Sequence, residues 1–149
     1  MPRYWILNCK EDQFDFQTAL NDEEILSDGM TWKVSEKWNE MQPGDVFFIY
    51  VASPHQSIVA CGYIEDAVRE RACDEKSAKY WNDQSKGKKA RRTFISIGHK
   101  FDPYVNSSVI NPEGTDSVQR VPLGQQGSNK QIPPLAALRM AKLLGIEFS

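Results

Sequence analysis

The sequence predicts one mixed α+β domain, with five or six strands and a few short helices, over residues 1–149. Short runs of aromatic and branched residues, bounded by Pro, Gly, Asn and Ser, recur along the chain and are typical of strands. These runs do not alternate with long helices, so a doubly wound parallel sheet is not expected. A length of 149 residues suits one domain with one hydrophobic core.

Four strands and two short helices are expected in the N-terminal half. The strands are predicted at residues 4–8, 30–34, 46–52 and 57–64. The third of these is apolar throughout, which is typical of a strand buried on both faces. Asp22 and Ser35 can each cap a helix that opens with acidic residues. The helices are therefore expected at residues 22–26 and 36–41.

The C-terminal half is expected to contain one long strand and two helices. Residues 92–101 alternate between apolar and polar side chains, as a half-buried strand does. Asp74 is the expected cap of a helix over residues 74–82. The apolar segment 135–145 follows two prolines and ends in a glycine, which is the usual asymmetry of a helix. A helix is therefore expected there. Residues 102–131 are polar and rich in Pro and Gly, and predict loops with one short strand near 118–121.

Composition excludes several classes of protein. The longest apolar runs are about seven residues, which is too short for a membrane-spanning helix. No secretory signal is evident. We therefore expect a cytoplasmic protein without a membrane partner. Three cysteines without a C-x-x-C pair and only two histidines argue against a metal site. No phosphate-binding glycine loop is present, and we expect no cofactor.

The charges are divided unevenly along the chain, although the net charge is only −2. Residues 1–75 carry 6 Lys/Arg and 15 Asp/Glu, a net of −9, whereas residues 76–149 carry 12 and 5, a net of +7. Such a chain can bind a polyanion through one face. The cations concentrate in one run, which predicts contact with phosphates or, alternatively, a solvated surface: Lys86, Lys88, Lys89, Arg91 and Arg92.

Five segments follow one another in a distinctive order along the chain. They are Tyr4-Trp5-Ile6-Leu7-Asn8, then Trp32-Lys33-Val34-Ser35, then Met41-Gln42-Pro43-Gly44-Asp45 running into an apolar strand, then residues 58–64, and finally Gln125-Gln126-Gly127-Ser128 before the last helix. This order resembles that of an EVE domain of the PUA-like superfamily, and it is similar to that of the YTH domain. Where the longer EVE pattern has Asp-Gly-Val-Arg-Asn-Tyr after the Trp, this chain has Lys33-Val34-Ser35.

The resemblance implies a strongly bent, PUA-like β-barrel flanked by short helices. It also implies a nucleic acid as partner, DNA or RNA, with a modified base such as a methylated adenine or cytosine read in an aromatic pocket. Trp32 and Trp81 would be walls of that pocket, although core packing is the alternative for both. The complete set of implied base-binding residues is Asn8, Cys9, Lys10, Trp32, Lys33, Val34, Ser35, Trp81, Gln126, Gly127 and Ser128.

The other two tryptophans, Trp5 and Trp38, are expected in the core. No nucleophile, base and orienting group occur together in the sequence, so a non-enzymatic binding module is predicted. The alternatives are a small-molecule or protein-interaction domain and, less favoured, a small hydrolase.

Overall fold

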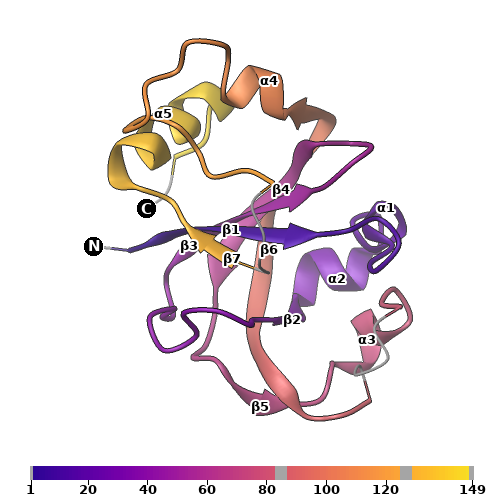
Figure 1. Cartoon of the computed structure of the whole chain (residues 1–149). Coiled ribbons are helices and arrows are strands. Elements are labelled where there is room, and N and C mark those ends of the chain that lie inside the picture. The colour runs from indigo at the N-terminus through magenta and orange to yellow at the C-terminus, as the bar shows by residue number, and fades with distance from the viewer. Residues whose placement is uncertain (1, 83–86, 125–128, 148–149) are drawn as a thin grey trace.

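The computed structural model describes residues 2–82, 87–124 and 129–147. Within these residues the chain forms one seven-stranded sheet in the order β2-β6-β4-β3-β1-β7, with β5 pairing with β6 (Figure 1). The predicted mixed α+β class is confirmed. The strands are β1 (Tyr4–Cys9), β2 (Met30–Lys33), β3 (Val46–Val51), β4 (Ser57–Ile64), β5 (Arg69–Arg71), β6 (Ala90–Asn106) and β7 (Asn129–Gln131); the helices are α1 (Phe16–Ala19), α2 (Glu23–Asp28), α3 (Glu75–Ala78), α4 (Ser107–Ile110) and α5 (Pro134–Leu144).

The sheet is a curled half-barrel of mixed direction. β1 runs parallel to β3, while β3–β4 and β4–β6 are antiparallel. The long strand β6 pairs with β4, β2 and β5, and its register against β4 shifts at two places, which bends it. Figure 1 shows β6 running the length of the molecule towards β5. The predicted bent barrel is confirmed as a half-barrel, with one strand more than expected.

The central strand β3 is buried over its whole length, because both faces of the sheet are covered. Phe47 and Ile49 point into one apolar cluster, which includes Trp5 and the residues of α1 and α2. Phe48 and Tyr50 point into the other cluster, beneath α5. A six-residue strand without polar positions is therefore explained by burial on both sides, as its sequence predicted.

The last helix is confirmed. α5 has proline at its first turn and ends at Gly145, which adopts the left-handed conformation with φ of 68°. The Gly145 N–H donates to the last carbonyls of the helix, which is the usual ending. Ala136 and Met140 bury one face of α5, while Leu138 is exposed on the other.

Three predicted elements are wrong. Residues 36–41 form turns instead of a helix, with Lys37 in the left-handed region at φ 48°. Residues 118–121 are turns instead of a strand, because the Val121 backbone N–H donates to the side chain of Asn111. The polar segment that follows residue 101 continues β6 to Asn106 and forms the unpredicted helix α4. The structure describes no helix long and apolar enough to cross a membrane.

Candidate nucleic-acid interface

Predicted site segments that are far apart in the sequence meet beside β1. Leu7 lies opposite Asn129 of β7 in the sheet register. The buried Asn129 side chain accepts a hydrogen bond from the Glu36 backbone N–H (3.2 Å) and donates to the Glu36 carbonyl (2.6 Å). Lys130 adds an ion pair to the Glu36 carboxylate at 3.1 Å. The end of β1, the segment after β2 and the start of β7 are thereby held together.

The three predicted residues at the end of β1 have different environments. Asn8 is half-buried, and its side-chain oxygen is shielded from solvent. Lys10 is exposed, directly after the strand. Cys9 is buried in the core, where burial raises the pKa of its thiol to about 12 and keeps it protonated. Lys10 is an accessible candidate for ligand contact. Asn8 lies opposite Tyr50 in the register of β1 with β3, on the sheet face of the cluster beneath α5, and the position of Cys9 favours packing.

Trp32 and Trp81 lie together with Phe14 in a group that we call the aromatic cluster. Phe14 stacks on Trp81 with ring centroids 4.3 Å apart and meets Trp32 edge-on at 5.4 Å. Trp32 and Trp81 are themselves in edge contact at 5.0 Å and 72°. Phe14 was not among the predicted site residues.

Trp32 departs from its expected environment. It lies on β2, opposite Thr93 of β6, and only 2% of its surface is exposed. Two rings at 72° and 5.0 Å cannot hold a planar base between them, so Trp32 and Trp81 do not face each other across an open cleft. Trp81 is half-buried and pairs with Phe14 through an isolated bridge outside the named strands. Trp81 is therefore the more accessible of the two indoles.

The remaining predicted residues after Trp32 differ in their exposure. Val34 is buried at 1% exposure, whereas Lys33 is half-buried and Ser35 is exposed. Gln126, Gly127, Ser128 and Lys86 lie outside the residues that the structure describes.

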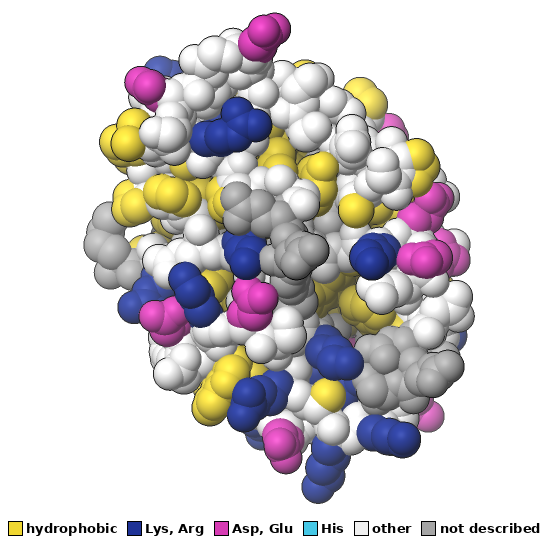
Figure 2. Space-filling model, viewed as in Figure 1, with side chains coloured by type: hydrophobic (Ala, Val, Ile, Leu, Met, Phe, Trp, Pro, Cys, Tyr) yellow, Lys and Arg dark blue, Asp and Glu magenta, His cyan; other side chains and the backbone are white. Residues whose placement is uncertain are grey.

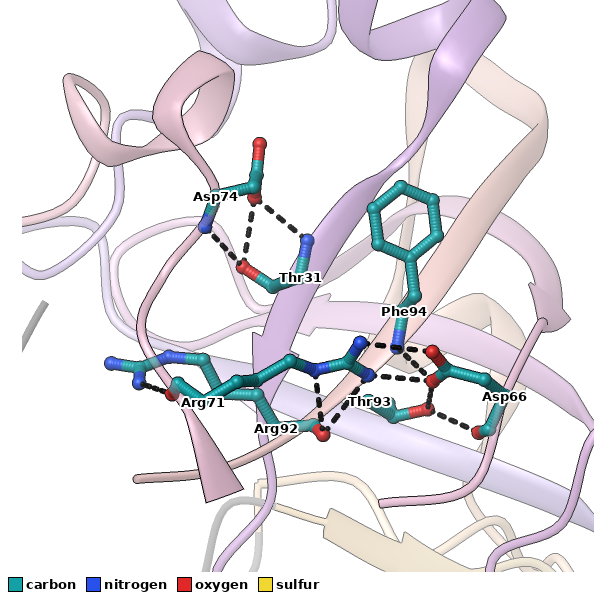
Figure 3. A network of polar contacts seen from close by, with 7 residues as sticks. All are labelled: Thr31, Asp66, Arg71, Asp74, Arg92, Thr93 and Phe94. Carbon is teal, nitrogen blue, oxygen red and sulfur yellow. Dashed lines mark hydrogen bonds and ion pairs between the residues drawn. The ribbon is translucent and has the colours of Figure 1, made fainter. Parts of the chain in front are cut away.

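Asp74 positions both indoles of the aromatic cluster. Its carboxylate accepts hydrogen bonds from the Thr31 backbone N–H (2.9 Å) and hydroxyl (2.8 Å), immediately before Trp32 (Figure 3). It also caps α3 by accepting from the Ser77 N–H (3.0 Å), and α3 leads into Trp81. Burial raises the pKa of Asp74, but the hydrogen bonds from Ser77 and Thr31 outweigh it and leave the pKa below its ordinary value.

A second polar network joins β5 to β6 below the aromatic cluster (Figure 3). Arg71 forms a bidentate pair with Asp66, at 2.9 and 2.6 Å. The Asp66 carboxylate also accepts from the Phe94 N–H at 2.8 Å. Burial raises the pKa of Asp66, but the hydrogen bonds from Arg71 and Phe94 outweigh burial, and the pKa lies below its ordinary value. This network holds β5 against the start of β6, which carries Arg91 and Arg92 of the predicted basic run.

Arg92 belongs to that network. It is only 3% exposed, and its guanidinium donates to the carbonyls of Arg71 (2.6 Å) and Lys88 (3.0 Å). This placement argues against the predicted contact of Arg92 with phosphate and gives it a structural role. A buried guanidinium is tolerated because carbonyl acceptors replace its lost water.

The exposed cations border the aromatic cluster. Lys88, Lys89 and Arg91 are exposed, and Lys33 lies opposite Arg92 in the register of β2 with β6. We call Lys33, Lys88, Lys89 and Arg91 the basic rim. Figure 2 shows Lys and Arg side chains gathered over the lower part of one face, around β5 and the start of β6. Within the described residues, no group of His, Cys, Asp and Glu could hold a metal ion.

A separate pocket of about 350 Å³ opens where β6 leaves β4. In the register of β4 with β6, Ile58 pairs with Val105 and Ala60 pairs with Lys100. One residue of β4 therefore lies opposite four residues of β6, which arch away from the sheet. The Lys100 ammonium lies at the pocket and donates to the Leu20 carbonyl (3.2 Å) and the Asn21 side chain (3.0 Å). Nothing in the sequence pattern indicated this pocket, because its floor depends on the register shift.

The curled half-barrel with short helices is a fold shared with solved YTH domains. The family model described as "EVE domain" matches residues 3–142, nearly the whole chain. This chain belongs to the EVE domain family. The predicted family is confirmed.

Solved structures with the same fold come from distant organisms. A Rhodopseudomonas palustris protein has a TM-score of 0.61 and 15% identity, with 96% of this chain and 93% of that chain covered. A hypothetical protein from Leishmania major has a TM-score of 0.61 and 12% identity, with 97% and 98% covered. A YTH domain from Zygosaccharomyces rouxii, in complex with N6-methyladenosine RNA, has a TM-score of 0.58 and 10% identity, with 99% and 89% covered. No curated protein matches the chain.

Proposed function

We propose that this chain is a non-enzymatic domain that binds a nucleic-acid strand and accommodates one modified base at the aromatic cluster. The observation that carries the proposal is that the basic rim adjoins the aromatic cluster: Lys33 directly follows Trp32 on β2, and Trp32 is in ring contact with Trp81. An aromatic ring can stack a base, and lysines can contact its phosphates. The YTH neighbour in complex with N6-methyladenosine RNA supports a methylated base as the ligand class.

Binding in this proposal requires Trp81 to move. Trp32 is fixed in the sheet, so a base can gain access only if Trp81 gives up its stack on Phe14. That stack is worth about 0.5–1.5 kcal/mol. Stacking of a base on an indole returns about 1–3 kcal/mol, and burial of one methyl group adds about 0.8 kcal/mol. At the middle of these ranges the exchange is favourable by about 1 kcal/mol for an unmodified base and by about 2 kcal/mol for a methylated one.

Fluorescence anisotropy with labelled single-stranded 9-mers tests the proposal. The probes are RNA with a central N6-methyladenosine, DNA with a central 5-methylcytosine, and the unmodified strand of each. We expect tighter binding of one modified strand, by roughly fourfold or more, the equivalent of one buried methyl group. Equal affinity for modified and unmodified strands would remove modified-base recognition from the proposal, and no binding of any strand would overturn it.

Trp81→Ala separates base recognition from phosphate contact. The variant should lose the preference for the modified strand and keep weak, salt-sensitive binding through the basic rim. Leu138→Ala is the matched control, because Leu138 is an exposed apolar residue of α5, away from the sheet edge that carries the site. A Trp81→Ala protein with full preference would show that the base binds elsewhere.

Small-molecule binding is a second candidate, favoured by the pocket at the β6 arch. Lys100 can offer a positive charge there, and Tyr104, at 36% exposure, offers part of an aromatic face. Because Asp102 lines the pocket together with Lys100, a small ring compound that carries both an acidic and a basic group would fit this chemistry. Lys100→Ala should abolish binding of such a compound by calorimetry and leave oligonucleotide affinity unchanged.

A further inference from the structure

Trp38 is exposed, although it was expected in the core. It lies in the turns that follow β2 and keeps 38% of its surface in contact with solvent. The guanidinium of Arg91 lies over its ring, 4.2 Å from the centroid. A large aromatic side chain that is accessible, with a cation on its face, is the chemistry of a stacking surface for nucleic-acid bases.

The Trp38–Arg91 pair borders the site already described. The Val34 backbone N–H donates to the Arg91 carbonyl at 2.9 Å, so this pair lies beside the segment that begins with Trp32. Lys88 and Lys89 precede Arg91 along the chain and are exposed. A strand that reaches the aromatic cluster therefore has a second aromatic face within the same basic surface.

The backbone before Trp38 is held in an uncommon conformation. Lys37 adopts a φ of 48°, in the left-handed region that non-glycine residues rarely occupy. The Glu40 N–H donates to the Lys37 carbonyl at 3.0 Å and closes the turn. Residues held in such conformations are concentrated at ligand-binding sites, and this turn presents Trp38 to solvent.

We propose that Trp38 is a second stacking platform, for the base next to the one at the aromatic cluster, and that Arg91 contacts the phosphate of that nucleotide. This inference rests on the proposed function and specifies its partner as a single strand. In a duplex, neighbouring bases cover each other's faces, so an external indole can stack only on an unpaired base.

Arg91 gives way to the base on binding. Stacking of a base on an indole is stronger than an exposed cation–π contact, so the base displaces the guanidinium from the Trp38 ring. Arg91 is exposed at the surface of β6, and its side chain can turn to a phosphate without disturbing the core. The same arginine thus shields the ring when the site is empty and neutralises charge when it is filled.

The test combines protein variants with altered strands. Affinity is measured for the better-bound modified 9-mer and for the same strand with abasic sites on both sides of the modified nucleotide. Trp38→Ala should weaken binding of the intact strand by roughly 5- to 100-fold. It should have little effect on the abasic strand, because the base that it stacks is already missing. Trp38→Phe should retain most of the affinity, and Leu138→Ala should retain all of it.

The outcomes separate this inference from the proposed function. If the original protein binds the modified strand and Trp38→Ala binds it equally well, the platform is wrong and the proposed function stands. Equal losses on the intact and abasic strands would also overturn the platform, because Trp38 would then not contact a flanking base. If the original protein binds no strand, the proposed function fails first.

Discussion

Removal of the Asp74 side chain is expected to loosen the positions of both tryptophans in the aromatic cluster. Asp74→Ala deletes four hydrogen bonds, two from Thr31 and two from Ser77. Loss of a helix cap costs about 0.5–2 kcal/mol. The Thr31 backbone N–H, on a residue only 4% exposed, then lacks its acceptor, which costs about 1–3 kcal/mol. The free energy of unfolding should therefore fall by about 2–4 kcal/mol.

Urea denaturation measures this loss, with Asp15→Ala as the control. Asp15 caps α1, a helix of the same length as α3, by accepting from the Thr18 N–H, and it lies exposed. Its replacement should cost only the cap, near the lower end of about 0.5–2 kcal/mol. The difference between the two variants is the contribution of Thr31. Equal losses would refute the argument that Asp74 ties β2 to α3.

Three further predictions follow from the contacts of individual side chains. Because folding lowers the pKa of Asp74, its carboxylate stabilises the fold fully above the ordinary carboxyl pKa, and this stabilisation is lost as the pH falls below about 4. The free energy of unfolding, measured as a function of pH in the acid range, should therefore depend less on pH in Asp74→Ala than in the original protein. Trp32→Ala should destabilise the protein by about 3–5 kcal/mol in chemical denaturation, as much as Trp5→Ala, since both are buried, and a Trp32→Ala protein of full stability would contradict its burial. Joint replacement of Lys88 and Lys89 by alanine should reduce the slope of log affinity against log salt concentration by about one to two, without a change in melting temperature. An unchanged slope would show that neither lysine contacts the strand.

The alternating and continuous apolar patterns were sufficient to predict most strands. β3 was predicted because every residue in it is apolar, and both of its faces are indeed buried. α5 was predicted from proline before it and glycine after it, since those residues act on the local backbone alone. The resemblance of ordered segments then indicated the EVE domain family, which the match over residues 3–142 confirms.

Local pattern failed where long-range contacts decide the backbone. The helix expected at residues 36–41 is replaced by turns, because the Asn129 side chain, from β7, binds the Glu36 backbone. Residues 102–106 resemble a loop in sequence but continue β6, because Asn106 and Val105 pair with the start of β4. No window of the sequence contains both members of these pairs.

The candidate site shows the same division. Through the resemblance to an EVE domain, the sequence indicated Trp32, Trp81 and the end of β1 as candidate base-binding residues, and its charge pattern indicated the basic run as a candidate phosphate contact. Tertiary structure alone decided their accessibility: Trp32 is buried by Phe14 and Trp81, Arg92 is bound to backbone carbonyls, and Trp38 is left exposed. Burial depends on which distant segments pack against a side chain, and that is set by the register of β6 with its partner strands.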